Sequence, residues 1–255
     1  MKKPLIILTG PTAVGKTKLS ISLAQAVNGA IISADSMQVY RHMDIGSAKI
    51  RPEEMCGVPH YLIDVLDPSE EFHVVKFVEL AHEAMEKIYA AGQIPIVTGG
   101  TGFYIQALLK EVDFTESHGE LPIRKQLEEK AATEEGAAEL YRELSEVDPA
   151  SAETIHPNNV KRVIRALEYY HETGQKISEH NEEQKQKESP YCSAYFVLND
   201  ERSILYDRID RRVDQMICDG LVDEVFRLKE MGYTRDLVSM QGLGYKEILE
   251  YLHQN

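Results

Sequence analysis

The sequence predicts an α/β fold in which helices cover both faces of a parallel sheet. Short apolar runs alternate with segments of helical period over residues 5–112, and glycines stand at the turns from strand to helix. Apolar runs without polar alternation are typical of parallel strands that are buried on both faces. From about Val112 the alternation ends, so we predict a mostly helical insertion at 113–189 within a core formed by 1–112 and 190–255.

The elements of the first core segment follow one another at short intervals. Apolar runs predict strands at 5–9, 30–34 and 94–98, with a weaker strand at 61–66. Helical period predicts helices at 16–27, at 77–90 and from Phe103 onward. The strand at 30–34 ends directly before Asp35-Ser36, which places a carboxylate at a strand end.

The predicted insertion is dominated by helical patterns. Residues 121–146 are rich in Glu and Ala, and 159–171 form an amphipathic pattern with Val163, Leu167 and Tyr170 on one face. The polar stretch at 177–189 is predicted to be a mobile loop. After it we expect a strand at 191–198 and a long helix at 203–229 that is interrupted near Gly220.

Composition limits the class of protein. The chain has 255 residues, a formal net charge of −14, and three widely spaced cysteines that suggest neither a disulfide framework nor a zinc site. No apolar run is long enough to span a membrane, so we expect a cytoplasmic protein without membrane association. The acidic net charge argues against a general nucleic-acid binder unless positive charge is concentrated locally.

A glycine-rich octapeptide follows the first predicted strand and precedes the first predicted helix. It fits the pattern G-x-x-x-x-G-K-[ST] in full and consists of Gly10, Pro11, Thr12, Ala13, Val14, Gly15, Lys16 and Thr17. In such a P-loop, backbone N–H groups and the helix N-terminus bind phosphate oxygens, the lysine neutralises their charge, and the threonine hydroxyl is a ligand for Mg²⁺. The core is therefore predicted to be P-loop NTPase-like and to bind a diphosphate or triphosphate.

Asp35 is an acidic residue that directly follows the predicted strand at 30–34. P-loop kinases and ATPases usually carry an acidic Mg²⁺ ligand at a second strand end, whereas the strand at 94–98 runs into Gly99-Gly100 without one. A carboxylate at a strand end of an α/β sheet faces the ligand crevice. The residues alone leave three roles open for Asp35: general base, metal ligand or helix cap.

Six blocks of the sequence resemble one enzyme family. They are GPTAVGKT at 10–17, SADSMQVYRHMDIGSAK at 33–49, PHYLID at 59–64, PIVTGGTGFY at 95–104, DPASAETIHPNNVKRVIRALEYY at 148–170 and GYKEIL at 244–249. Together they resemble the bacterial tRNA dimethylallyltransferases, also called tRNA isopentenyltransferases. The resemblance implies a P-loop core with a helical insertion. It also implies transfer of a dimethylallyl group from dimethylallyl diphosphate to N6 of the adenine 3′-adjacent to the tRNA anticodon.

The resemblance further implies roles for individual residues. The P-loop is expected to hold the diphosphate leaving group, with Lys16 and a Mg²⁺ ion on Thr17 stabilising its charge, while Asp35 takes the proton of the adenine amine. Positions that match tRNA contacts in the family are Asp35, Ser36, Met37, Gln38, Thr101 and Arg124, and Thr101 is also grouped with the catalytic residues. Arg208 and Arg212, one helical turn apart, are candidates for contacts with the diphosphate or the tRNA backbone.

The predicted insertion carries a local cluster of positive charge, which could bind tRNA although the chain as a whole is acidic. Lys161, Arg162 and Arg165 cluster in the block that contacts the tRNA anticodon stem-loop in the family. By composition such a run is more typical of a solvated helix face with pairs such as Arg165 and Glu168. The resemblance instead favours a tRNA surface. Family members usually continue past the position of Asn255 with a basic helical segment, whose absence we expect to affect tRNA affinity more than chemistry.

Three other functions fit parts of the same pattern. A nucleotide or small-molecule kinase would use the P-loop for phosphoryl transfer, and a related isopentenyltransferase would act on free adenine nucleotides without a basic insertion. A nucleotide-controlled RNA-binding switch would show nucleotide-dependent affinity without a product. We expect the protein to be a monomer.

Overall fold

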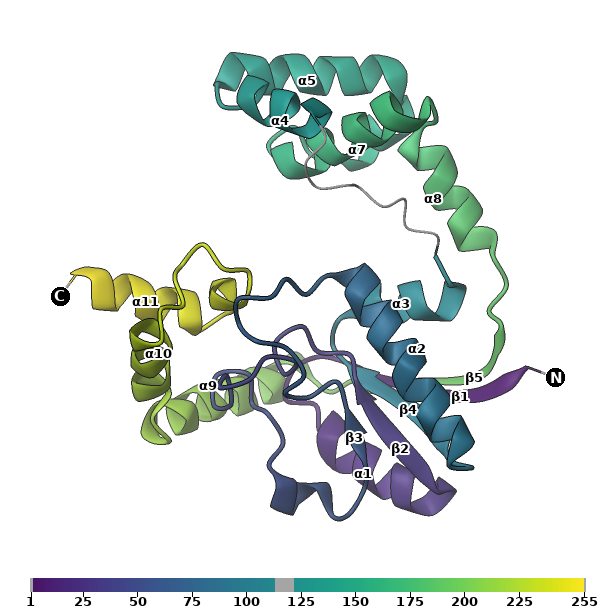
Figure 1. Ribbon diagram of the computed structural model, residues 1–255, viewed down its shortest axis with the longest axis vertical. Coiled ribbons are helices and arrows are strands. Elements are labelled where there is room, and N and C mark those ends of the chain that lie inside the picture. Colours follow the sequence, from purple (N-terminus) through teal and green to yellow (C-terminus); the bar gives the residue numbers. More distant parts are fainter. Residues whose placement is uncertain (1, 113–121, 255) are drawn as a thin grey trace. The chain divides into compact units, whose positions relative to one another are not determined.

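The computed structural model describes residues 2–112 and 122–254, which form two compact units (Figure 1). Unit 1 comprises Met1–Leu109 and Ser189–Asn255, and unit 2 comprises Lys110–Glu188. The predicted start of the insertion at residue 113, and the predicted helical start at Leu121, lie outside the described residues. Each unit has a buried apolar core of its own.

Unit 1 is built on a five-stranded sheet with the strand order β3-β2-β4-β1-β5. Every pair of neighbouring strands is parallel. The strands are β1 (Lys3–Thr9), β2 (Gly29–Ser33), β3 (His60–Tyr61), β4 (Ile94–Gly99) and β5 (Tyr191–Val197). The predicted strands at 5–9, 30–34, 94–98 and 191–198 are therefore confirmed to within one or two residues.

The predicted strand at 61–66 is wrong in extent. Only His60–Tyr61 forms β3, because Leu62 and Asp64 have φ of 62° and 55°, which no extended strand accommodates. Farther along, Leu66 forms an isolated parallel β-bridge with Tyr40, outside the five strands.

The two faces of the sheet bury different side chains. In β2, Ala30 and Ile32 pack in the apolar cluster that includes residues of α2 (Val74–Ala90), whereas Ile31 packs in the cluster that includes residues of α1 (Lys16–Val27). Because side chains alternate along a strand, α1 and α2 cover opposite faces. The predicted fold class, a parallel sheet with helices on both faces, is confirmed.

The remaining helices of unit 1 lie in the segments that follow strands β2, β4 and β5 in sequence. α3 (Gly102–Lys110) follows β4, and α9 (Arg202–Cys218), α10 (Leu221–Glu230) and α11 (Tyr245–Gln254) follow β5, with 3₁₀ helices at Pro52–Met55 and Ser239–Gln241. The predicted interruption near Gly220 is confirmed. Gly220 separates α9 from α10 with φ of 99°, a conformation that glycine adopts at little cost.

Unit 2 is helical over its described residues. Its helices are α4 (Pro122–Lys130), α5 (Glu134–Val147), α6 (Pro149–Thr154), α7 (Val160–Thr173) and α8 (Ile177–Gln186). The helical stretch predicted at 121–146 consists of two helices, because Thr133 caps α5 by accepting the N–H of Gly136 at 3.1 Å.

The prediction of a mobile loop at 177–189 is wrong, because Ile177–Gln186 forms α8. The segment is polar, but Glu, Gln and Lys are good helix formers. Its first turn is anchored by Asp148, whose carboxylate accepts the N–H of Ser178 at 3.0 Å and its hydroxyl at 2.6 Å. Among the described helices of both units, none has the length and apolar character that crossing a bilayer requires.

Candidate active site

The glycine-rich loop joins β1 to α1 and needs its glycines for steric reasons. Gly10 and Gly15 have φ of 152° and 97°, and a Cβ on Gly10 would lie 2.4 Å from the carbonyl oxygen of Leu198. Gly15 is the N-cap of α1. The unpaired N–H groups of the first helical turn therefore lie at the loop, and N–H groups in this arrangement favour the binding of anions.

The ammonium group of Lys16 lies over this loop. Its Nζ donates hydrogen bonds to the carbonyl oxygens of Gly10 and Pro11, both at 2.8 Å. Burial lowers the pKa of Lys16 below its ordinary value; the Asp35 carboxylate partly offsets this shift, and the Arg212 guanidinium adds to it. Lys16, Asp35 and Arg212 thus interact electrostatically at one site.

The predicted catalytic segments meet at one edge of the sheet. The last residues of β1 and β2 pair with the last residues of β4, which lies between them. The glycine-rich loop follows β1, Asp35 follows β2, and Thr101 follows β4 at the start of α3. The edge is closely packed, since a Cβ on Gly99 would lie 2.3 Å from the carbonyl oxygen of Ala34.

The Asp35 carboxylate is oriented by its own turn. Its Oδ1 accepts the N–H of Met37 at 2.8 Å and that of Gln38 at 3.3 Å. Within residues 2–112 and 122–254 no hydrogen bond is made to Oδ2. Burial raises the pKa of Tyr104, and the negative charge of Asp35 raises it further. One oxygen of Asp35 therefore caps the turn while the other is available to a ligand.

Of the two arginines predicted on one helix, the structure brings Arg212 to the site. Arg212 lies on the more buried stripe of α9 that also carries Leu205 and Met216. Burial lowers the pKa of Arg212, and the Asp35 carboxylate opposes this shift. Arg208 lies outside that stripe and forms an ion pair with Asp200 at 2.9 Å.

Residues 36–38 differ in their accessibility. Ser36 is exposed, whereas the Met37 thioether lies so close to Gly242 that a Cβ there would be 2.5 Å from Cε of Met37. The Gln38 amide accepts the Ser33 hydroxyl at 3.1 Å and donates to backbone carbonyls of residues 47 and 48. Gln38 therefore links the end of β2 to the segment that follows it.

A cleft of about 720 Å³ opens beside the loop within unit 1. Thr17 and Arg212 line one part of it, together with Met216 on the same face of α9. Another part of the lining belongs to a segment that we call the 44–51 wall, whose lining residues are Asp44, Ile45, Ala48, Lys49, Ile50 and Arg51. The lining of the cleft thus includes cationic, acidic and apolar side chains.

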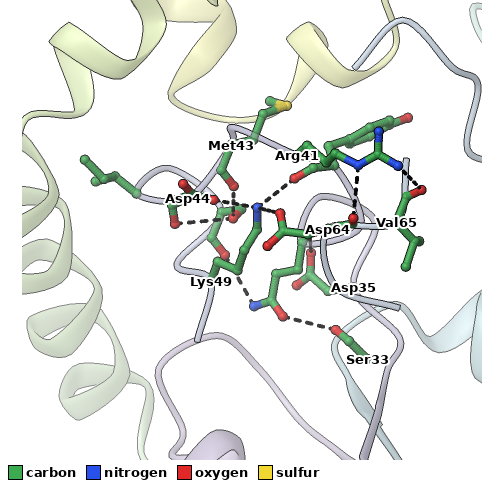
Figure 2. Close-up of polar contacts among 12 residues, drawn as sticks. Ser33, Asp35, Arg41, Met43, Asp44, Lys49, Asp64 and Val65 are labelled. Atoms are coloured by element: carbon green, nitrogen blue, oxygen red, sulfur yellow. Dashed lines mark hydrogen bonds and ion pairs between the residues drawn. The ribbon is translucent and has the colours of Figure 1, made fainter. Parts of the chain in front are cut away.

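A buried lysine stabilises the 44–51 wall (Figure 2). The Lys49 side chain is 5% exposed, and its Nζ donates to Asp44 Oδ1 at 2.6 Å, Asp64 Oδ1 at 2.5 Å and Tyr40 O at 2.7 Å. Arg41 also binds this region through the carbonyl oxygens of residues 64 and 65. Lys49 and its two aspartates lie in the blocks at 33–49 and 59–64, but no sequence motif predicts a role for them.

In unit 2 the predicted tRNA-contacting cations fall into two groups. Arg124 and Arg165 both pair with Oε2 of the buried Glu168, at 3.3 and 2.9 Å, which ties α4 to α7. Lys161 and Arg162 are exposed, and neither forms an ion pair with any described residue. The expected pair between Arg165 and Glu168 is therefore present, while Lys161 and Arg162 present solvated charge.

A metal site made of protein side chains alone is not seen in the described part of the chain, where no cluster of three or more His, Cys, Asp or Glu residues could hold an ion. The Thr17 residue is exposed and lines the cleft beside the phosphate loop. Mg²⁺ commonly keeps several waters and binds through few protein ligands plus phosphate oxygens. The exposed Thr17 hydroxyl therefore fits an ion that takes most of its ligands from water and phosphate oxygens.

Comparison with known proteins places this chain in a family. Residues 38–255 match the family model described as IPP transferase. A curated tRNA dimethylallyltransferase from Lachnoclostridium phytofermentans is 66% identical over 250 residues, which are 98% of this chain and 80% of that relative.

Solved structures agree with this match. A tRNA isopentenylpyrophosphate transferase from Bacillus halodurans has a TM-score of 0.71 at 46% identity, covering 100% of this chain and 78% of that one. The corresponding protein of Staphylococcus epidermidis has a TM-score of 0.68 at 42% identity, covering 100% and 82%. A eukaryotic dimethylallyltransferase, captured acting on tRNA, has a TM-score of 0.84 at 36% identity, covering 99% and 64%. The resemblance found in the sequence is confirmed, and the chain belongs to the IPP transferase family, the family of the tRNA dimethylallyltransferases.

Proposed function

We propose that the protein transfers a dimethylallyl group from dimethylallyl diphosphate to N6 of the adenine 3′-adjacent to the anticodon of tRNA. The products are N6-isopentenyladenosine and diphosphate. The observation that carries this proposal is the strand-end carboxylate of Asp35 beside Lys16 and Arg212 at a phosphate loop. A base next to a diphosphate site suits nucleophilic displacement of diphosphate by an amine.

The chemistry of the adenine acceptor requires a base that takes the proton of its amine, and Asp35 is proposed to be that base. The lone pair of an exocyclic adenine amine is delocalised into the ring, so the amine needs a base to take its proton while the N–C bond forms. Oδ1 of Asp35 is held by two backbone N–H groups. The second oxygen is proposed to accept the proton. Ser36, Met37, Gln38 and Thr101 surround Asp35 in sequence or at the sheet edge and are proposed to border the adenine.

The leaving group needs positive charge as its bond to carbon breaks. Residues 10–17 are proposed to hold the diphosphate through loop N–H groups, with Lys16 and Arg212 neutralising the negative charge that develops on its oxygens. A Mg²⁺ ion on the Thr17 hydroxyl supplies further charge stabilisation to the diphosphate when it is bound. The apolar residues Ile45, Ala48 and Met216 of the adjacent cleft are proposed to contact the five-carbon chain.

Replacing Thr17 with alanine tests the assignment of the metal. We expect the Mg²⁺ concentration for half-maximal turnover to rise on the order of tenfold, because the ion loses its protein ligand. Thr17→Ser keeps the hydroxyl and is the matched control, with near-parental Mg²⁺ dependence. Superimposable Mg²⁺ titrations of Thr17→Ala and the parent would remove Thr17 from the site.

The tRNA surface is proposed to include Arg124, Lys161, Arg162 and Arg165 of unit 2. Arg124 and Arg165 each form an ion pair with Glu168. Substituting the exposed Lys161 and Arg162 therefore tests electrostatic binding of tRNA without breaking either ion pair. The plot of log affinity for tRNA against log salt has a negative slope. In the Lys161→Ala/Arg162→Ala variant we expect the magnitude of this slope to decrease by about 1.5. Each lost phosphate contact removes roughly 0.7–0.9 from that slope.

The control for this double variant is Lys87→Ala, which removes an exposed lysine of α2 in unit 1. Its salt slope should equal that of the parent. Fluorescence anisotropy with labelled tRNA at several salt concentrations gives all three slopes. A parental slope in the double variant would mean that Lys161 and Arg162 are only solvated.

The acceptor distinguishes the proposed activity from its rivals. Labelled dimethylallyl diphosphate is incubated with Mg²⁺ and either unmodified tRNA or AMP, and each acceptor is then assayed for label. Label on tRNA alone is expected; label on AMP would indicate an enzyme of free nucleotides, and label on neither would indicate a kinase or a binding protein. β4 ends at Gly99 and is followed by Gly100-Thr101 rather than an acid, which disfavours the kinase. The monomeric state and cytoplasmic location stay predictions.

A further inference from the structure

Glu224 on α10 is a buried carboxylate with no part in the chemistry described so far. Only 2% of its surface is exposed. It accepts the backbone N–H groups of Asp44, Ile45 and Gly46 at 3.0, 2.8 and 3.2 Å, and the hydroxyl of Tyr245 at 2.6 Å. Both of its oxygens are therefore fully used as acceptors, and it is closed to any substrate.

Tyr245 completes this arrangement from α11. The residue is completely buried, and its pKa is raised chiefly by that burial and next by its hydrogen bond to Glu224. A Cβ on Gly46 would lie 2.6 Å from atoms of the Tyr245 ring, so only glycine allows the ring to lie against this turn. The blocks at 33–49 and 244–249, which are far apart in sequence, meet here.

The turn that Glu224 holds is part of the cleft. Asp44 and Ile45 line it, and Lys49 continues the same 44–51 wall. Arg212 and Met216 of α9 also line the cleft, and α10 begins directly after the turn at Gly220 that follows α9. Glu224 thus connects the 44–51 wall to the helix pair that contributes Arg212 and Met216 to the lining.

We propose that Glu224 and Tyr245 are positioning residues that set the width of this cleft and thereby the affinity for the dimethylallyl chain. The inference rests on the proposed function, because it assigns the cleft to that chain. Neither residue touches the substrate. They act through the backbone of residues 44–46, whose N–H groups donate to the Glu224 carboxylate.

Substitutions at the two positions should have graded effects. In Glu224→Gln one acceptor oxygen becomes an NH₂ group, which cannot accept, so at least one buried N–H of the turn loses its partner and the turn shifts. Tyr245→Phe keeps the ring against Gly46 and removes only the hydroxyl. The phenylalanine variant should therefore act in the same direction with a smaller effect.

The matched control is Asp148→Asn in unit 2. Asp148 is 1% exposed and accepts four hydrogen bonds, from the N–H and hydroxyl groups of Ser151 and Ser178. It resembles Glu224 in burial and hydrogen bonding but does not line the cleft. A general loss of stability should thus appear in both carboxamide variants, whereas a change in the cleft should appear only at Glu224.

The experiment measures binding by calorimetry and backbone protection by hydrogen exchange in the full chain. For Glu224→Gln we expect the Kd of dimethylallyl diphosphate to rise about tenfold, while the Kd of inorganic diphosphate stays within about twofold. Exchange of the N–H groups of residues 44–46 should accelerate without any ligand. Asp148→Asn should leave all three values at those of the parent.

Equal weakening of both ligands, or an unchanged Kd for dimethylallyl diphosphate in both Glu224→Gln and Tyr245→Phe, overturns the inference. Unchanged exchange at 44–46 overturns it as well, and this readout needs no substrate. If Glu224→Gln does not fold, Tyr245→Phe decides by the same criteria. A parent protein that binds dimethylallyl diphosphate but transfers nothing to tRNA would contradict the proposed function while leaving the cleft measurement valid.

Discussion

Asp35→Asn is expected to lower kcat by about 10²–10⁴-fold, with little change in diphosphate affinity. An asparagine oxygen can still accept the N–H groups of Met37 and Gln38, so the turn that orients residue 35 is kept. The second position then carries an NH₂ group, which cannot take a proton from the adenine amine. Steady-state kinetics with tRNA and calorimetry with diphosphate measure the two quantities.

The same position separates the three roles that the sequence left open. If Asp35 were mainly a metal ligand, diphosphate affinity would fall together with kcat, and added Mg²⁺ would restore part of the rate. If it were only a cap, Asp35→Ala would lower the free energy of unfolding by about 1 kcal/mol while turnover survived. A near-parental kcat in Asp35→Asn would defeat the assignment of Asp35 as the base.

Arg212→Gln is expected to lower kcat/KM for dimethylallyl diphosphate by about 10²–10³-fold, because one charged donor to the leaving group is lost. Arg212 interacts with Asp35 and with Lys16, so its removal also takes a like charge from beside Lys16. The pKa of the Lys16 ammonium should then rise. The lysine stays protonated, and the lost rate reflects the missing guanidinium.

Arg208→Gln is the matched control, one helical turn away on α9. Arg208 is paired with Asp200 and lies off the stripe that carries Arg212. Its substitution should change kcat/KM by less than about twofold, the scale of independent surface changes. Equal losses in the two variants would show that the distinction between the two arginines has no functional meaning.

The sequence predicted the parts of the fold that local patterns determine. The strands at β1, β2 and β4 are unbroken apolar runs, and α1 and α2 have clear helical period, so each was predicted close to its observed bounds. The segment at 177–186 was misread because its polar composition hides a helix whose first turn is held by Asp148, 30 residues away. The strand at 61–66 failed because two residues there take positive φ.

The site shows the same division between local and distant information. The phosphate loop and Asp35 each follow a predicted strand directly, so the sequence alone predicts that they lie at the same edge of the sheet. The choice of Arg212 over Arg208 depends on which stripe of α9 is buried. Glu224 binds N–H groups 178 to 180 residues away in sequence, and backbone N–H groups carry no residue signature that a pattern could reveal.

If the phosphate loop holds a leaving group, the enzyme transfers carbon and releases phosphorus. Dimethylallyl diphosphate labelled with ¹⁴C in the chain and ³²P in the diphosphate tests it in a single reaction with unmodified tRNA. We predict ¹⁴C in the tRNA, located on N6 of the adenine 3′-adjacent to the anticodon, and all ³²P in free diphosphate. Phosphorus bound to the acceptor, or tRNA without ¹⁴C, would contradict transfer of the dimethylallyl group.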